Sequence, residues 1–259
     1  MKKYLTLFLI SITSYSYCQE TFSFTSKIHP KKTYSLQMDI SSINETTINN
    51  KTTKSSSISR ITRVTNTENA NSNGLFPTTM NFGEVIVSGA GKEVLSPISK
   101  TIIKGLLSED SKFKIDTIIN PNLDPQIKNA LKSVFKDLKP DIDFPKNPLQ
   151  IGDSFDYKIP MNIPTNGEQI KVLITKKFTL KSVTNNLAKF TVDEIVSLNM
   201  ESQNIKAIGD GNGFVEFNIL ENQIVKDKSH FTIDITIKKE KNNIRGVITS
   251  DSEKTLKIQ

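Results

Sequence analysis

Apolar and polar residues alternate along much of this chain, and the alternation predicts β-strands. Tyr34, Leu36, Met38 and Ile40 alternate with polar residues, and residues 58–64 continue as a strand rich in Ser, Thr and Arg. Because successive side chains of a strand point to opposite faces, each segment has one apolar and one polar face. That arrangement is typical of an antiparallel sheet with one face buried and the other in water.

A long hairpin is predicted in the second half of the chain. Residues 170–183 and residues 190–200 both alternate, and the turn between them is rich in Asn. Residues 231–237 repeat the pattern. Asn tolerates the left-handed backbone conformation that tight turns need. Pairs of asparagines therefore predict turns at 49–50, 185–186 and 242–243. The apolar faces of the two hairpin strands hold Ile170, Val172, Ile174, Phe178 and Leu180, then Phe190, Val192, Val196, Leu198 and Met200.

One amphipathic helix is predicted over residues 124–138. Asp124 is a suitable N-cap, Pro125 suits the first helical position, and Pro140 ends the helix. Such a helix must pack its apolar stripe against the sheet. The stripe has three- and four-residue spacing and comprises Ile127, Leu131, Val134, Phe135 and Leu138. A weaker helical pattern covers Ile98 to Leu107.

The order of these elements predicts an α+β fold, mainly antiparallel β, with a large curved, half-barrel-like sheet and one main helix packed on it. Residues 66–78 are rich in Asn, Ser and Thr and predict a flexible loop, and the prolines of 139–153 predict an extended crossing. Because similar strands lie on both sides, residues 19–259 are interpreted as one domain. A division into two sub-domains near 120–145, at the helix, is the alternative.

The N-terminal 18 residues have the pattern of a cleavable secretory signal. Lys2 and Lys3 precede an apolar stretch from Tyr4 to Ile12, which is well below the ~20 apolar residues of a membrane span. Ser16 and Cys18 are small enough for signal peptidase if cleavage falls after Cys18. The mature protein would then be exported to the periplasm, the outer membrane or the extracellular space.

Cys18 also allows a second interpretation, in which it is the lipidated N-terminus of an anchored lipoprotein. Lipidation requires a small residue before the cysteine and usually an aliphatic residue at −3. Tyr17 and Tyr15 occupy these positions, and both are bulky. The pattern therefore favours cleavage over anchoring, and a mature protein without cysteine.

Composition argues against nucleic-acid binding. The formal net charge is +7, and without Lys2 and Lys3 the balance is 32 basic against 27 acidic residues, or +5. The basic residues are dispersed, and the chain has no Trp and only five Tyr. Nucleic-acid binding needs a clustered basic surface with aromatic residues for stacking. No segment after the signal has the length of a membrane span.

A glycine-rich segment, Gly209 to Gly213, has some features of a calcium loop. Asp210 and Asn212 supply oxygens, and Glu221 stands at the twelfth position counted from Asp210. However, residues 214–217 alternate like a strand, with Phe214, Val215 and Phe217 where a calcium loop continues, and do not have the character of a ligand loop. The glycines are interpreted as a turn or bulge.

Other candidate sites have equally plain interpretations. His29 and His230 are far apart in the sequence and are read as surface histidines. Ser88 to Lys92 contains Gly-Ala-Gly-Lys, but the spacing of a phosphate loop is absent and Glu93 follows the lysine. That segment is interpreted as a turn. None of these patterns predicts a catalytic, cofactor-binding or metal-binding residue.

Two junctions carry a family resemblance. Residues 144–155, Phe-Pro-Lys-Asn-Pro-Leu-Gln-Ile-Gly-Asp-Ser-Phe, and residues 209–217, Gly-Asp-Gly-Asn-Gly-Phe-Val-Glu-Phe, precede alternating segments. With the Cys-Gln-Glu end of the signal, the chain resembles an uncharacterised family of exported β-rich proteins common in Bacteroidota. Its layout is also distantly similar to the periplasmic half-barrel carriers of lipoproteins. The resemblance implies no activity and no functional residue.

Three functions remain open from the sequence. A large sheet with one covering helix leaves apolar surface, which favours an envelope protein that binds a lipid-like ligand or an envelope partner. A structural or interaction protein with a filled core is the main alternative. A hydrolase with a site assembled from distant residues is the third.

Overall fold

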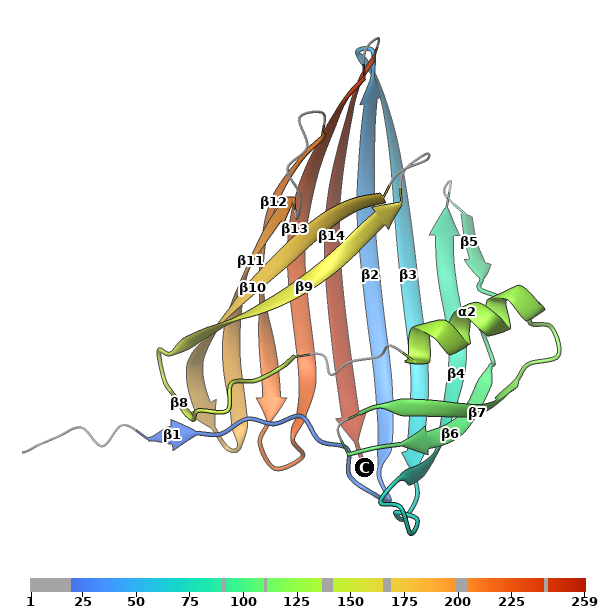
Figure 1. Ribbon diagram of the computed structural model, residues 1–259, viewed down its shortest axis with the longest axis vertical. Coiled ribbons are helices and arrows are strands. Elements are labelled where there is room, and N and C mark those ends of the chain that lie inside the picture. Colours follow the sequence, from blue (N-terminus) through green and yellow to red (C-terminus); the bar gives the residue numbers. More distant parts are fainter. Residues whose placement is uncertain are drawn as a thin grey trace, which may run out of the picture.

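The computed structural model describes residues 20–89, 92–109, 111–136, 142–164, 169–198, 205–239 and 242–259 (Figure 1). These residues form an α+β fold that is mainly antiparallel β, as predicted. The first half contains β1 (Thr21–Phe22), β2 (Thr33–Ile48), β3 (Lys51–Thr67), β4 (Phe76–Gly89), β5 (Lys92–Leu95), β6 (Ile102–Leu107) and β7 (Phe113–Ile119). The second half contains helix α2 (Pro125–Lys136), β8 (Leu149–Gln150), β9 (Ser154–Pro164), β10 (Gln169–Thr184), β11 (Leu187–Leu198), β12 (Ile205–Asn218), β13 (Gln223–Lys239) and β14 (Asn242–Ile258).

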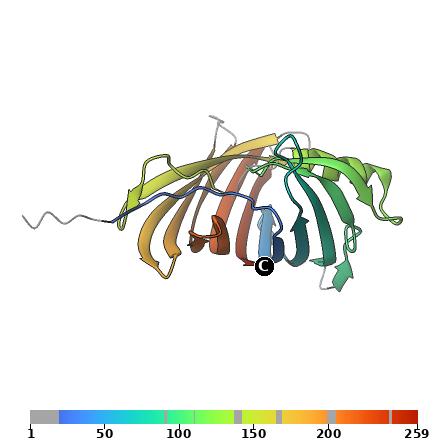
Figure 2. The same cartoon turned by 90° about the horizontal axis from the view of Figure 1, so that it is seen from below.

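Within the described residues, 12 strands form one open sheet in the order β7-β6-β4-β3-β2-β14-β13-β12-β11-β10-β9, with β5 beside β4. Every pairing is antiparallel, and β14 joins the two halves by pairing with β2 from Ile258↔Tyr34 to Ile244↔Ile48. The strands before and after α2 therefore belong to the same sheet. The sheet is curved, and its two edges rise on the side where α2 and the N-terminal segment lie (Figure 2). We call this side the concave face.

Asparagine turns connect two of the longest strand pairs. Asn49 and Asn50 join β2 to β3, and Asn185 and Asn186 join β10 to β11, all four with positive φ between 49° and 66°. Two-residue hairpin loops of type I′ need this conformation at both positions. The turn predicted at Asn242 and Asn243 is wrong, because both residues pair with β13 and begin β14.

Helix α2 begins as predicted, and Asp124 Oδ1 accepts a hydrogen bond from the Gln126 amide at 2.7 Å. Phe135 is buried, and Leu131 packs beside it, while Leu138 and Pro140 lie outside the described residues. The weaker helix predicted over 98–107 is wrong. Residues 102–107 form β6, whose pairing with β4 and β7 decides the conformation of this short apolar segment.

Two predicted connections need different bounds. The loop predicted over 66–78 is shorter, because Asn66 and Thr67 pair with Thr79 and Thr78 at the ends of β3 and β4. The extended crossing predicted over 139–153 is shorter as well. Residues 142–148 form neither helix nor strand, and β8 and a turn follow them. Residues 139–141 lie outside the described part of the chain.

The glycines of 209–213 lie inside β12, so the turn or bulge predicted there is wrong. Gly209, Gly211 and Gly213 share the concave face, and a Cβ at each would lie only 2.2–2.6 Å from a carbonyl oxygen of β13. The register of β12 with β13 is continuous here and shifts only between Glu216 and Phe217. Glycine is therefore needed for the close approach of two strands where the sheet curves.

Candidate binding site on the concave face

An aromatic cluster fills one part of the concave face, over β10 to β13. Phe24 of the N-terminal segment packs edge-on against Phe190 at 5.1 Å and Phe217 at 5.6 Å between ring centroids. Phe144 of the proline-rich crossing also packs edge-on against Phe217, at 5.1 Å. We call this group the aromatic cluster; its buried members are Phe24, Ile142, Leu149, Phe178, Leu180, Ala188, Phe190, Val192, Val215, Phe217 and Ile224.

A second cluster lies under α2, over the other edge of the sheet. Phe135 of the helix packs edge-on against Phe113 of β7 at 5.9 Å and Phe82 of β4 at 6.5 Å. We call this group the helix cluster; its buried members are Met80, Ile103, Leu107, Phe113 and Phe135. The two clusters bury the concave face at its two sides, and β2, β3 and β14 run between them.

A cavity of about 430 Å³ lies between the two clusters. It shares Ile224 with the aromatic cluster and Met80, Leu107 and Phe113 with the helix cluster. Its apolar lining comprises Ile28, Tyr34, Leu36, Met38, Met80, Leu107, Phe113, Ile224 and Leu256. The cavity therefore lies over the centre of the sheet, where neither cluster covers it.

The alternating residues of β2 form the floor of this cavity. Leu36 lies directly opposite Leu256 of β14, and Met38 and Tyr34 stand on the same face two residues to either side. Of these, Tyr34 is buried, while Leu36 and Met38 are only half-buried. The apolar face predicted for this strand is thus confirmed, but much of it faces the cavity instead of a packed core.

Tyr34 closes one end of the floor. Its hydroxyl accepts a hydrogen bond from the His29 amide at 2.8 Å and donates one to the His29 carbonyl at 3.3 Å. Burial raises the pKa of the Tyr34 phenol, the His29 hydrogen bond opposes this effect, and the negative charge of Glu221 adds to it. The phenol therefore stays neutral and apolar toward the cavity.

Three charged side chains also line the cavity. Lys254 of β14 lies directly opposite Asp227 of β13 on one side and Met38 of β2 on the other. Arg63 of β3 lies directly opposite Leu36 of β2. Directly opposite residues on one face of an antiparallel pair have Cβ atoms about 4.5–5.5 Å apart, so Asp227 and Lys254 are close neighbours. All three side chains are half-buried.

Thr65 contributes a buried hydroxyl to the same lining. The residue is 5% exposed, and its Oγ1 makes no hydrogen bond to any described residue. A buried polar atom without a partner is uncommon in proteins and costs stability. Its position two residues after Arg63, on the same face of β3, places an unused hydrogen-bonding group in the cavity wall.

The N-terminal segment 24–29, which we call the strap, crosses the cavity and contributes Ser26 and Ile28 to its lining. On one side the Lys27 amide donates to the Asn222 carbonyl at 3.0 Å, and His29 Nε2 lies 3.1 Å from the Glu221 carbonyl. On the other side the Ile28 amide donates to the Glu109 carbonyl at 3.2 Å. The strap thus connects the β12–β13 turn to the β6–β7 turn.

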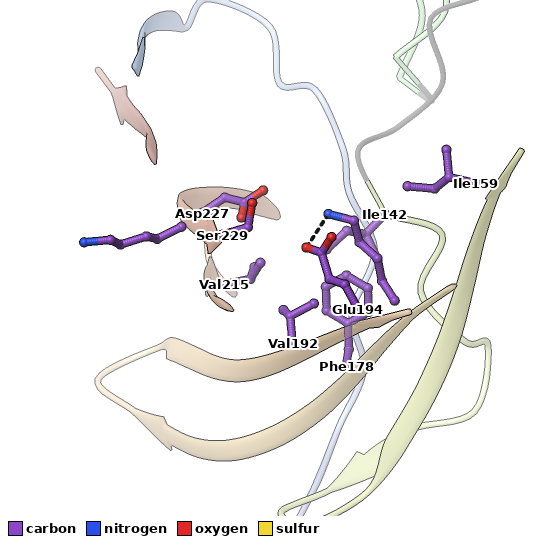
Figure 3. A pocket seen from close by; sticks show the side chains of 10 residues that line it. Ile142, Ile159, Phe178, Val192, Glu194, Val215, Asp227 and Ser229 are labelled. Atoms are coloured by element: carbon purple, nitrogen blue, oxygen red, sulfur yellow. Dashed lines mark hydrogen bonds and ion pairs between the residues drawn. The ribbon is translucent and has the colours of Figure 1, made fainter. Parts of the chain in front are cut away.

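A smaller pocket of about 50 Å³ lies beside the aromatic cluster (Figure 3). Lys176 Nζ and Glu194 Oε1 form an ion pair of 2.8 Å in its wall, and Glu194 is 4% exposed. Asp227 lines this pocket as well as the large cavity. This volume has room for one or a few ordered waters and is far below the roughly 300–1,000 Å³ of small-molecule pockets.

The two histidines are not brought together. His29 belongs to the strap, whereas His230 lies exposed beside Asp251, with 2.8 Å between Nδ1 and Oδ1. His230 alternates with the buried Ser229 and therefore stands on the opposite face of the sheet from the cavity. The surface interpretation of His230 is confirmed, and His29 is half-buried.

The calcium and phosphate patterns do not form sites either. Asp210 is exposed on β12, while Glu221 lies in the β12–β13 turn and pairs with Lys32 at 3.0 Å. Gly89 of β4 pairs with Lys92 of β5, and Ala90 and Gly91, where the turn is predicted, lie outside the described residues. Among the described residues, no three His, Cys, Asp or Glu side chains gather in a way that holds a metal ion.

The polar residues of the cavity were not predicted from the sequence. Arg63 and Thr65 lie in a segment where many polar residues face water, so nothing local marks them as facing inward. Asp227 and Lys254 occupy the apolar phase of their strands, which is a usable signal. In β13 that phase is interrupted at Val225, which has no partner in β12 because Glu216 pairs with Lys226 and Phe217 with Ile224.

No protein-family model matches the chain, and no curated protein matches its sequence. A solved structure concerned with lipid–protein interactions in lipovitellin aligns with a TM-score of 0.42 and 12% identity. The alignment covers 89% of this chain and 26% of that chain, so this chain spans about a quarter of the lipovitellin chain. At this TM-score the likeness carries no argument. The described part of the chain has no helix of the length and apolarity needed to cross a bilayer.

Proposed function

We propose that this chain is an exported, non-enzymatic binding protein of the cell envelope that holds a lipid-like ligand on its concave face. The observation that carries the proposal is the cavity of about 430 Å³ between the aromatic cluster and the helix cluster. Export and the resemblance to exported Bacteroidota proteins rest on the N-terminal pattern and the two junctions of the sequence. Cleavage after Cys18 remains the expected processing, with lipidation of Cys18 as its alternative.

The cavity has the properties of a ligand site. Protein interiors contain few voids larger than a water molecule, whereas small-molecule pockets measure roughly 300–1,000 Å³. Leu36, Met38 and Leu256 present apolar surface to this space from adjacent strands. A ligand with an apolar chain removes that surface from water, at roughly 25 cal/mol per Å².

The alternative function, a structural or partner-binding protein with a filled core, is supported by the aromatic cluster. That cluster packs 11 buried residues over β10 to β13, and the pocket described beside it measures only about 50 Å³. A fully packed sheet would need no ligand. The two proposals differ in what occupies the space over β2, β3 and β14.

Organic extraction of the purified protein, followed by mass spectrometry, tests the proposal. We expect a lipid at close to one equivalent, and a delipidated sample that is stabilised on adding it back. A ligand present at 100 times its Kd stabilises a protein by about 2.7 kcal/mol, or roughly 5–10 °C in Tm for a chain of this size. No extracted lipid and no Tm shift across a lipid panel would support the filled-core alternative.

A cavity-filling variant localises the effect. Leu36→Trp places a large ring in the cavity, whereas Gln37→Trp, the matched control, places it on the opposite, exposed face of the same strand. We expect Leu36→Trp to lose the co-purified lipid and Gln37→Trp to retain it. Equal lipid content in the two variants would place the ligand elsewhere.

A further inference from the structure

We infer that the cavity binds a single-chain lipid, whose one acyl chain lies across the strands beneath the strap and has a limited length. The inference rests on the proposed function, because it names the class of the same ligand. A fatty acid and a monoacylglycerol share this chemistry, which is one apolar chain on a small head group. Lipids with two chains are excluded by it.

The first argument is the volume of the cavity. An acyl carbon occupies nearly the volume of a water molecule in the liquid, about 30 Å³, so the cavity of about 430 Å³ holds about 14 carbons. That is one chain of ordinary length. A diacyl lipid with two such chains needs about twice this volume.

The second argument is the shape of the lining. It is drawn from seven neighbouring strands, β13-β14-β2-β3-β4-β6-β7, which extend roughly 29 Å around the curved backbone. On β2, by contrast, the lining runs only from Tyr34 to Met38, or roughly 13 Å along the strand. The long direction of the cavity therefore runs across the strands, which is also the direction of the strap.

The third argument is that both ends of this long direction are closed by packed side chains. Ile224, at the β13 end, is 4% exposed and belongs to the aromatic cluster. Leu107 and Phe113, at the opposite end, are each 5% exposed and belong to the helix cluster. A bound chain cannot extend past these residues without displacing them, so the cavity sets a maximum chain length.

The fourth argument is that the strip beside the first chain is polar. On the side away from the strap, the lining of β13 and β14 ends with Asp227 and Lys254, which lie directly opposite each other. The next pair on the same face, Ser229 and Ser252, is joined by a hydrogen bond of 2.9 Å. A second chain laid there would cover polar groups and gain little from burial.

A chain-length series tests the limit. Saturated fatty acids from octanoate to arachidate compete with a polyene fatty acid, whose chain is itself fluorescent, for the delipidated protein. We expect the affinity to rise roughly tenfold for every two carbons up to myristate or palmitate, because each buried methylene adds a similar increment, and then to stop rising. Monoacylglycerols should show the same limit, and the series that binds more tightly identifies the head-group class.

The outcomes of this series separate the two proposals. An affinity that keeps rising to arachidate, or that is independent of chain length, overturns this inference and leaves the proposed function intact. If no fatty acid, no monoacylglycerol and no probe binds, both fail.

The number of chains is tested with two lipids that share a head group. Delipidated protein is incubated with lysophosphatidylcholine carrying one myristoyl chain, or with phosphatidylcholine carrying two, and native mass spectrometry after gel filtration counts the bound lipid. We expect one equivalent of the single-chain lipid and none of the two-chain lipid. Retention of the two-chain lipid at one equivalent, or of neither lipid, would overturn the inference.

A variant of the end wall assigns the limit to this cavity. Phe113→Ala removes a ring from the end at β7, so the longest chain that still gains affinity should shift toward stearate or arachidate. Phe178→Ala is the matched control, because Phe178 is equally buried but lies in the aromatic cluster and does not line the cavity. Phe113→Leu preserves more of the packing and should shift the limit in the same direction by less. An unchanged limit in both Phe113 variants, or an equal shift in Phe178→Ala, would overturn the inference.

Discussion

Replacing Thr65 by valine is expected to stabilise the ligand-free protein. The side chain is 5% exposed, and its hydroxyl makes no hydrogen bond to any described residue. Burying a hydroxyl without a partner costs about 1–3 kcal/mol, and valine replaces it with a methyl group of similar size. We therefore expect Thr65→Val to raise the free energy of unfolding by about 1–2 kcal/mol, or Tm by roughly 2–8 °C.

Urea denaturation of the delipidated proteins is the assay, with the midpoint rising at an unchanged m-value. Thr67→Val is the matched control on the same strand and face, since Thr67 is also 5% exposed. Its hydroxyl donates to the His29 carbonyl at 2.8 Å and accepts from the Lys32 amide at 3.1 Å. Thr67→Val should therefore lower the free energy of unfolding by about 1–3 kcal/mol.

A loss of stability in Thr65→Val similar to that in Thr67→Val would show that the Thr65 hydroxyl is already satisfied without ligand. That result would refute its assignment as an unused donor in the cavity wall.

Three further predictions concern the surroundings of the cavity. Burial raises the pKa of Tyr34, so the stability that its neutral phenol contributes is present below pH ~10 and is lost as pH rises through the folded-state pKa. In thermal melts above pH 10, Tyr34→Phe should therefore lose less stability than wild type. Equal losses of stability in the two proteins would contradict this. Glu194→Ala removes the ion-pair partner of the Lys176 ammonium and should lower the free energy of unfolding, measured by urea denaturation, by roughly 3 kcal/mol. The double variant Lys176→Met/Glu194→Leu should regain most of this loss. A double variant as unstable as the single one would argue against the unpaired ammonium as the cause. Gly211→Val should prevent folding as judged by circular dichroism, because its Cβ would lie 2.6 Å from a β13 carbonyl oxygen. Gly246→Ala, whose Cβ would have no atom within 4 Å, is the control and should fold. A folded Gly211→Val would exclude the close approach of β12 and β13 as the reason for glycine at this position.

The elements that the sequence predicted correctly are those set by local chemistry. The β10–β11 hairpin follows from two alternating segments around Asn185 and Asn186, and α2 follows from its cap at Asp124. The buried face of these strands also follows from the local alternation, since Phe178 and Phe190 are buried as the alternation requires.

The errors arise where distant parts of the chain decide the structure. Residues 98–107 have a short apolar pattern without a clear period, and pairing with β4 and β7 makes 102–107 a strand. Gly209 to Gly213 look like a turn locally, yet they allow β12 to approach β13 closely. Neither pairing partner is visible in the local pattern.

The cavity was beyond prediction for the same reason. The sequence shows that Leu36 and Met38 share an apolar face, but not whether another segment covers it. The segment that crosses it is the strap, whose Ser26 and Ile28 reach the cavity only in the folded chain. Arg63 and Thr65 face the cavity for the same reason, since the same residues on an uncovered strand would be ordinary surface groups.

Photo-crosslinking with a palmitate that carries a diazirine near the end of its chain tests the central claim most directly, because it locates the ligand on the protein. Mass spectrometry of the digested adduct should place the label on residues that line the cavity, such as Leu36, Leu256 or Met80. The label should be lost on competition with unmodified palmitate. A competable label on the exposed outer residues Ile195 and Ile208 instead would contradict a binding site on the concave face.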